Sequence, residues 1–295
     1  MFQFLPVRLR DYWALTKPRP TIMALITVLA GYQIGLNHQP VLSDVLHLIL
    51  GAYLVGAGAN AWNQWIERDA DRKMKRTQNR PMPSGRMKPL EGALIASAAS
   101  SGGWIYLWCV FGPLAAFLSG ALWLSYVAVY TPMKRVTPWA LYVGAVSGAL
   151  PPILGYGVAR GSVGLEAGIL FLILFLWQIP HFIAIAWIYE DDYRAGGFPM
   201  ISVQDPTGHR AQAPMAICGT LLLAAVVAPV WIGMAGSAYL VVALAFGVAF
   251  LWMGLDFVQK PSRPKARGVI FVSVIYLCAL VIMLAADKNG RLSGF

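Results

Sequence analysis

Charged residues are scarce in this sequence. Asp, Glu, Lys and Arg make up 12% of its 295 residues, about half the share found in a typical soluble globular chain. Hydrophobic residues make up 58%, and the mean hydropathy is +0.61. Acidic residues are the rarer charged class, with 13 Asp and Glu against 23 Lys and Arg. The composition excludes an ordinary soluble domain and indicates an integral membrane protein.

The sequence also has few cysteines and no nucleotide-binding glycine loop, and both features reduce the number of possible functions. The three cysteines, Cys109, Cys218 and Cys278, lie far apart inside apolar segments, which predicts packed thiols rather than disulfides or metal ligands. No Walker-type glycine loop occurs, so nucleotide hydrolysis has no support. We expect no cleavable signal peptide and no Arg/Ser-rich transit segment before the first apolar run, which favours a bacterial inner membrane.

Apolar runs long enough to cross a bilayer recur along the whole chain. Spanning the hydrocarbon takes about 20 residues, and only a helix satisfies its own backbone there. The expected spans are 20–37, 43–65, 90–111, 113–131, 137–158, 167–188, 211–233, 236–257 and 267–286. We therefore predict an all-α integral membrane protein, a bundle of about nine transmembrane helices that forms a single domain over residues 1–295.

The basic residues support this count. If the amino terminus is cytoplasmic, all the Lys and Arg residues fall on the inner side except Arg160, Lys288 and Arg291. This asymmetry is what the positive-inside rule requires. The net charge of +10 is then mostly an orientation signal and implies no nucleic-acid partner. The carboxyl terminus is expected outside.

Polar residues interrupt the apolar pattern first in the segment 60–88. Asn60, Asn63, Glu67 and Asp71 are spaced by three or four residues, so their side chains share one face of a helix. A basic cluster follows directly: Arg72, Lys73, Lys75, Arg76 and Arg80. Carboxylates and amides beside arginines at a membrane face indicate a site for a divalent metal and an anionic phosphate.

A second polar segment, 178–210, follows the sixth span. Pro180 should kink that helix and let Gln178 and His181 point into the bundle. Three acidic residues are expected to close the helix and could hold a second metal, with two tyrosines as donors to phosphate: Glu190, Asp191, Asp192, Tyr189 and Tyr193. Four spans separate the two segments, which suggests two four-helix halves plus a ninth helix.

Each feature also has an ordinary explanation. Acids at a helix end are often only solvated, a histidine in an apolar helix is usually a packing residue, and basic runs can serve topology alone. The coincidence of both segments on one side favours function, because ionisable groups at membrane depth are costly. Magnesium commonly bridges carboxylates to substrate phosphates, and arginines bind phosphate in bidentate fashion. We therefore expect a lipid diphosphate whose tail lies in an apolar cavity.

The two segments resemble those of the UbiA superfamily of intramembrane prenyltransferases, and within it the protohaem IX farnesyltransferase branch. The first segment matches at Asn63, Gln64, Glu67, Asp71, Met74, Arg76, Thr77, Arg80 and Pro81. The second matches at Gln178, Pro180, His181, Phe182, Trp187, Asp192, Tyr193, Gly197, Pro199 and Met200. The resemblance covers most of the chain. One departure is Glu190, where many members carry lysine, so a basic diphosphate contact there is in doubt.

The resemblance implies transfer of farnesyl from farnesyl diphosphate to a vinyl group of haem B, followed by addition of water to give haem O. It assigns Asn63, Glu67 and Asp71 to a first Mg²⁺ and Asp192 to a second. Arg76 and Arg80 would bind diphosphate with Tyr189 and Tyr193, while Asn60 and Gln178 would support the site. His181 could contact the haem iron, hold a propionate or assist proton or water transfer. Haem B is then a substrate, and a haem A synthase or terminal oxidase is implied as assembly partner.

Two other functions stay open on the sequence. A prenyltransferase of the same superfamily could use another acceptor, such as a hydroxybenzoate or a tetrapyrrole alcohol, although the Gln178 to Phe182 run argues against it. A secondary transporter for an anionic substrate would also suit broken helices and repeats. A transporter site should lie near the midplane, whereas these charges gather at the inner ends of the spans.

Overall fold

The computed structural model of the chain describes residues 7–288, 290 and 292. Within these residues all regular secondary structure is helical, and the only β-pairing is one isolated bridge between Ala235 and Lys288. The helices in chain order are α1 (Val7–Leu15), α2 (Pro18–Gly35), α3 (Leu42–Asp71), α4 (Pro89–Phe111), α5 (Pro113–Trp123), a π-helical stretch (Leu124–Tyr130), α6 (Thr131–Met133), α7 (Ala140–Ala149), α8 (Pro151–Arg160), α9 (Leu165–Ile188), α10 (Glu190–Gly196), α11 (Ile201–Gln204), α12 (His209–Ala225), α13 (Ala228–Trp231), α14 (Ser237–Gln259) and α15 (Arg263–Ala286). The predicted all-α class is confirmed.

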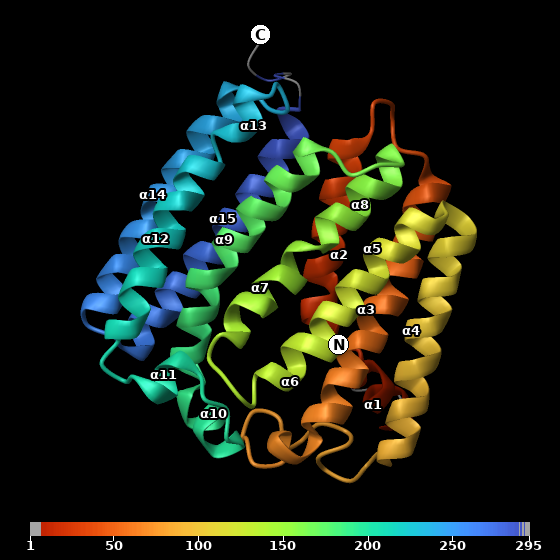
Figure 1. Cartoon of the computed structure of the whole chain (residues 1–295), viewed down its shortest axis with the longest axis vertical. Helices are drawn as coiled ribbons and strands as arrows, with labels where there is room; N and C mark the ends of the chain where they lie inside the picture. Colours follow the sequence, from red (N-terminus) through yellow and green to blue (C-terminus); the bar gives the residue numbers. More distant parts are fainter. Residues whose placement is uncertain (1–6, 289, 291, 293–295) are drawn as a thin grey trace.

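The long helices run side by side along one direction (Figure 1). Eight helical segments in the described part of the chain are long and apolar enough to cross a membrane, and they coincide with the predicted spans from 43–65 onward. The first predicted span, 20–37, is helical as α2 but begins with Pro18, Arg19 and Pro20 and is not among the eight. The chain is a multi-pass membrane protein, and the count of nine stays a prediction.

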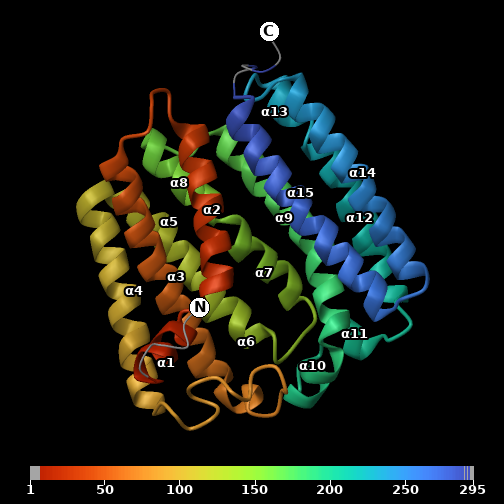
Figure 2. The ribbon, with the colours of Figure 1, turned by 180° about the vertical axis from the view of Figure 1, so that it is seen from behind.

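The short elements divide between the two ends of the bundle. α1, α6, α10 and α11 gather at one end with the loop that follows α3, whereas α13 lies at the other end (Figure 1). The same division is visible from behind (Figure 2). Both polar segments of the sequence therefore reach the same end, as predicted. The orientation of this end toward the cytoplasm stays a prediction.

Close helix contacts depend on small residues. A Cβ at Gly31 in α2 would lie 1.9 Å from the carbonyl oxygen of Pro152, and a Cβ at Gly155 in α8 would lie 1.8 Å from that of Val28. These two glycines let the backbones of α2 and α8 touch, as small residues do in membrane bundles. The contact packs α2 directly against α8.

Two helix boundaries lie directly before proline. α4 ends at Phe111 and α5 begins at Pro113, with Gly112 at a φ of 83° between them, which agrees with the predicted boundary between the spans 90–111 and 113–131. The predicted span 137–158 divides into α7 and α8 at Leu150, directly before Pro151 and Pro152. Pro180, in contrast, lies inside the continuous helix α9.

Candidate active site

The polar segment 60–88 is called the first motif below, and the segment 178–210 the second motif. The polar side chains of the first motif lie on α3, the longest helix. Its residues Asn60, Asn63, Glu67 and Asp71 are all buried, and all of them line one cavity. The predicted shared face is therefore confirmed. The helix ends at Asp71, so the two carboxylates sit in its last two turns, where the chain enters the basic loop.

Each carboxylate of this face is paired with a cation. Glu67 Oε1 accepts a hydrogen bond from Lys134 Nζ at 2.7 Å, and Asp71 Oδ2 accepts one from Arg80 Nη1 at 2.6 Å. The second oxygen of Asp71, Oδ1, is fully buried and has no hydrogen-bond partner. A buried carboxylate oxygen without a partner is costly and marks a position that a cation could satisfy.

Two lysines in the site were expected from the sequence only to contribute to the orientation signal. Lys17 Nζ donates to Asn63 Oδ1, and Lys134 lies over the rings of Tyr130 and Phe198. Burial lowers the pKa of Lys17 to about 7, helped by the positive charge of Arg80. Burial alone would also lower the pKa of Lys134, but the Glu67 carboxylate raises it above its usual value. Lys134 therefore stays charged, whereas Lys17 titrates near neutrality.

The backbone of Lys17 adopts an unusual conformation. Its φ is 47°, which makes it the one non-glycine residue with positive φ in the described part of the chain. Such a conformation persists where neighbouring groups hold it. Gln64 Nε2 donates to the carbonyls of Ala14 and Leu15, and Asn60 Nδ2 donates to that of Thr16 at 3.3 Å. The first motif thus fixes the turn that presents Lys17.

Both polar atoms of the Asn60 side chain are engaged in hydrogen bonds, which leaves it little capacity to bind a metal. Besides Thr16, its Nδ2 donates to Thr21 Oγ1 at 3.0 Å, and its Oδ1 accepts from Tyr126 at 3.3 Å. Its predicted supporting role therefore fits positioning of the α2 start better than metal ligation. Asn63 in turn donates from Nδ2 to Thr131 Oγ1 at 3.0 Å, which aims its Oδ1 into the cavity.

The acids of the second motif lie at the start of α10 rather than closing the preceding helix, because α9 ends at Ile188. They also point apart: Glu190 pairs with Arg194, and Asp191 pairs with Arg263. Asp192 alone reaches the first motif, where its Oδ1 accepts the backbone N–H of Arg76 at 3.3 Å. The expectation that the three acids together form a metal site is wrong, and Asp192 as a metal ligand stays a prediction.

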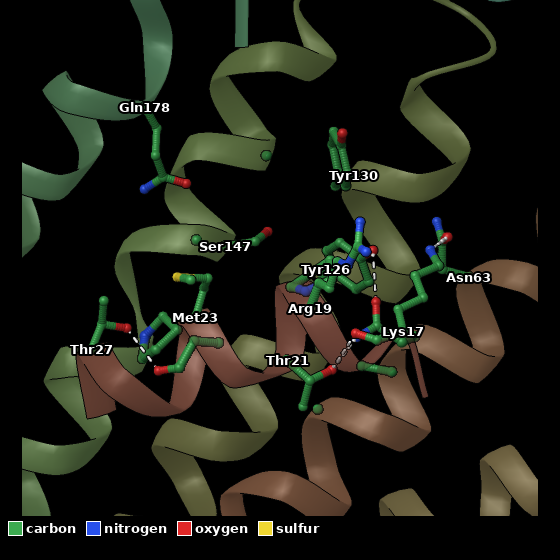
Figure 3. A pocket seen from close by; sticks show the side chains of 18 of the residues that line it. Lys17, Arg19, Thr21, Met23, Thr27, Asn63, Tyr126, Tyr130, Ser147 and Gln178 are labelled. Carbon is green, nitrogen blue, oxygen red and sulfur yellow. Dashed lines mark hydrogen bonds between the residues drawn. The ribbon is translucent and has the colours of Figure 1, made fainter. Parts of the chain in front are cut away.

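The cavity has a volume of about 820 Å³ and extends from the first motif to α9 and α15. Nine of the predicted site residues line it: Asn60, Asn63, Glu67, Asp71, Arg76, Arg80, Gln178, His181 and Tyr193. Tyr189 and Asp192 do not. The Tyr189 ring instead lies under the Arg76 guanidinium, whose carbon is 4.6 Å from the ring centre. Figure 3 shows Lys17 and Asn63 at one side of the cavity and Gln178 and Ser147 at the other.

Two further tyrosines of the cavity come from the π-helical stretch. Tyr126 and Tyr130 both line it, with their ring centres 5.6 Å apart. π-helical turns are rare in proteins, but those that occur are often found at functional sites. Here it brings the two rings, four residues apart, beside the carboxylates of α3. No spacing in the sequence indicated this, because the residues 113–131 show only a uniform apolar run.

The donor set fits Mg²⁺ bound together with a phosphate. Asn63, Glu67 and Asp71 offer hard oxygen ligands on one helix face, and Asp71, whose Oδ1 has no partner, lines the cavity together with Lys17, Arg80 and Lys134. Within residues 7–288, 290 and 292, no group of three His, Cys, Asp or Glu side chains forms a metal site. Magnesium seldom uses an all-protein cage and is instead held by one or two carboxylates plus substrate phosphates. The residues therefore suit a metal that arrives with its substrate.

Comparisons with known proteins agree with this geometry. Residues 24–283 match the model of the UbiA prenyltransferase family. The chain is 40% identical to the protoheme IX farnesyltransferase of Solibacter usitatus (strain Ellin6076) over 291 residues, which cover 96% of this chain and all of that protein. It is 36% identical to the protein of the same name from Opitutus terrae, with 94% of each chain covered.

Solved structures share the fold at low sequence identity. A digeranylgeranylglyceryl phosphate synthase superimposes with a TM-score of 0.79 at 19% identity, covering 95% of this chain and 98% of that one. A UbiA homologue from Archaeoglobus fulgidus bound to GPP and Mg²⁺ gives a TM-score of 0.67 at 14% identity, covering 93% and 99%. Together with the relatives, these matches confirm the resemblance drawn from the two motifs.

Proposed function

Because the chain belongs to the UbiA prenyltransferase family, we propose that it transfers a farnesyl group from farnesyl diphosphate to a vinyl group of haem B, giving haem O and diphosphate. The observation that carries the proposal is the charged end of the cavity. There Glu67 and Asp71 are surrounded by Lys17, Lys134 and Arg80, while the rest of the cavity is mostly apolar.

The charged end would bind the diphosphate of the donor. Asn63, Glu67 and Asp71 would hold Mg²⁺, which when bound neutralises the developing charge on the leaving diphosphate. Arg76 and Arg80 suit bidentate contacts with phosphate oxygens, and the two lysines add compact positive charges. These fixed charges favour departure of diphosphate because they are aimed at the place where negative charge develops.

The apolar part of the cavity would hold the farnesyl chain and the acceptor. When the allylic C–O bond breaks, its electrons leave with diphosphate and a carbocation remains. The π electrons of the vinyl group attack this cation and form the new C–C bond. Water then adds to the vinyl-derived cation and loses a proton, which gives the hydroxyethylfarnesyl group. Exclusion of bulk water would protect the first cation from hydrolysis, and the tyrosines of the π-helical stretch line the same cavity.

The site would face the cytoplasm. The basic loops gather at the end of the bundle where the cavity is charged, and the positive-inside rule places such loops in the cytoplasm, at the inner membrane of a bacterium. A haem A synthase or a terminal oxidase under assembly would receive the product. Asp192 would support a second Mg²⁺ through its place beside the Arg76 backbone.

The proposal is tested on membranes that contain the expressed protein, supplied with Mg²⁺, haem B and farnesyl diphosphate. Extracted haems are separated and weighed by mass spectrometry. We expect a haem heavier by one farnesyl group plus one hydroxyl group, absent with EDTA and from the Asp71→Asn variant. Metal-dependent release of diphosphate without a new haem would reject haem as acceptor and point to another prenyl acceptor. Uptake of an anion into vesicles without any covalent product would favour a transporter.

A further inference from the structure

A histidine and a serine meet across two helices that line the apolar part of the cavity. α9 and α15 lie side by side in both views (Figures 1 and 2). His181 Nδ1 of α9 lies 2.7 Å from Ser273 Oγ of α15, and Ser273 is fully buried. The same Oγ lies 2.7 Å from the backbone carbonyl of Ile270. Three electronegative atoms thus share hydrogen bonds at one hydroxyl.

The protons of this group can be assigned from its chemistry. A serine hydroxyl has one proton, and the carbonyl of Ile270 has none. The contact between these two oxygens therefore requires the hydroxyl proton of Ser273. Because that proton is committed, the contact between Ser273 and His181 must use a proton on Nδ1. The imidazole is held as the Nδ1–H form, and its Nε2 carries a free lone pair.

The ring is also fixed in orientation. The indole of Trp177 stacks on the imidazole of His181 with ring centres 4.9 Å apart and planes 18° from parallel. Trp177 Nε1 donates at 2.9 Å to the backbone carbonyl of Ser273, so the stacked rings of Trp177 and His181 are both tied to the same residue of α15. Both rings line the cavity. No hydrogen bond of the described residues engages Nε2.

We propose that His181 Nε2 is the axial ligand of the haem iron while the acceptor is bound, and that Ser273 is the positioning residue that fixes its tautomer and direction. The inference rests on the proposed function, because it requires haem as the acceptor. Histidine ligands of metals typically donate their other ring N–H to a fixed partner, which is the arrangement seen here. A free Nε2 lone pair suits iron, whereas contact with a propionate would need a proton on that nitrogen.

The chemistry of the surrounding wall agrees with a macrocycle. The residues that line the cavity near His181 from α9 and α15 are apolar apart from Gln178: Leu174, Phe182, Ile185, Val274, Leu277 and Cys278. Such a wall would cover the face of a porphyrin and leave its iron as the one atom that attracts a nitrogen lone pair. Ligation would then fix the depth of the porphyrin, and with it the distance of its vinyl group from the donor.

The direct test is spectroscopic and uses the purified full-length protein with haem B. We expect the ferrous complex to show an iron–histidine stretching band by resonance Raman spectroscopy. The band should be absent in His181→Ala and should return when imidazole is added to His181→Gly. Metal-free protoporphyrin IX provides a second comparison. Wild type should bind haem B at least about tenfold more tightly than protoporphyrin, and His181→Ala should bind the two alike.

Ser273 has a matched control within the chain. Ser119 is also fully buried in a long helix and donates to the carbonyl three residues before it, but no histidine contacts it. We expect Ser273→Ala to shift the iron–histidine band and weaken haem binding about tenfold, and Ser273→Thr to restore both. Ser119→Ala, which removes the same kind of hydroxyl, should leave the band unchanged.

The outcomes separate this inference from the function on which it rests. A wild-type spectrum without an iron–histidine band, or one unchanged by His181→Ala, overturns the ligand assignment even if haem O is still formed. An unchanged band in Ser273→Ala overturns the positioning role, whatever happens to protein yield. Failure of wild type to bind or farnesylate haem B, with diphosphate still released to another acceptor, removes the proposed function together with the inference.

Discussion

Replacement of Lys134 by methionine tests the electrostatics of the site most sharply. The Lys134 ammonium is 2.7 Å from Glu67 Oε1, and the side chains are only 12% and 3% exposed. Methionine keeps most of the length of the side chain and removes its charge, so Glu67 becomes a buried carboxylate without its cation. Removing one partner of a buried ion pair typically costs about 3–5 kcal/mol. We expect Lys134→Met to lower the free energy of unfolding by about that amount.

The double variant Lys134→Met/Glu67→Gln separates stability from chemistry. Without the unpaired carboxylate, it should recover most of the lost stability, as a double-mutant cycle would show for a strongly coupled pair. It should remain inactive, because a metal ligand and a diphosphate contact are both gone. Thermal unfolding in detergent and formation of haem O measure the two properties. If Lys134→Met unfolded like wild type, or if the double variant were less stable still, the pairing argument would be refuted.

Three further predictions concern the same cavity. Asp71→Asn should lower turnover about a thousandfold, equivalent to about 4 kcal/mol of lost charge stabilisation, without unfolding the protein; near-normal turnover with Mg²⁺ would remove Asp71 from the metal site. Arg76→Ala should weaken farnesyl diphosphate binding and leave haem binding nearly unchanged, as measured by separate titrations with the two substrates. Gly148→Ala would place a Cβ 1.9 Å from Gln178 Oε1, so it should displace that side chain, cost about 1–3 kcal/mol of stability and reduce turnover. Gly102→Ala, whose Cβ meets no atom within 4 Å, is its control.

The features that the sequence predicted depend on contacts that are local in the chain. Apolar run length determines which segments become spans, and eight of the nine expected segments are helices of that kind. The common face of Asn63, Glu67 and Asp71 follows from helical periodicity alone. The break between α4 and α5 is also local, because glycine tolerates the φ of 83° at Gly112 and the ring of Pro113 fixes its own φ at a helical value.

The features that it missed depend on contacts between distant segments. Lys17 and Lys134 lie far from the first motif in the chain, and their pairing with Asn63 and Glu67 exists only after α2, α3 and α6 come together. For the acidic residues of the second motif, the sequence predicted a cluster that does not form. Its residues are adjacent in sequence, but successive side chains on a helix point about 100° apart, so Asp191 faces α15 while Asp192 faces the Arg76 backbone.

The charge balance of the site explains why a metal and a diphosphate suit it together. The side chains of Lys17, Lys134 and Arg80 surround the two carboxylates of α3, and burial, together with the positive charge of Arg80, lowers the pKa of Lys17. Mg²⁺ alone would add to this positive charge, and diphosphate alone would meet the two carboxylates. With both present, Glu67 and Asp71 would hold the metal, and the side chains of Lys17, Lys134 and Arg80 would be free to bind the phosphate oxygens. Each ligand would therefore raise the affinity for the other, as linkage between two sites requires, and the carboxylates of α3 are the groups through which that coupling would act.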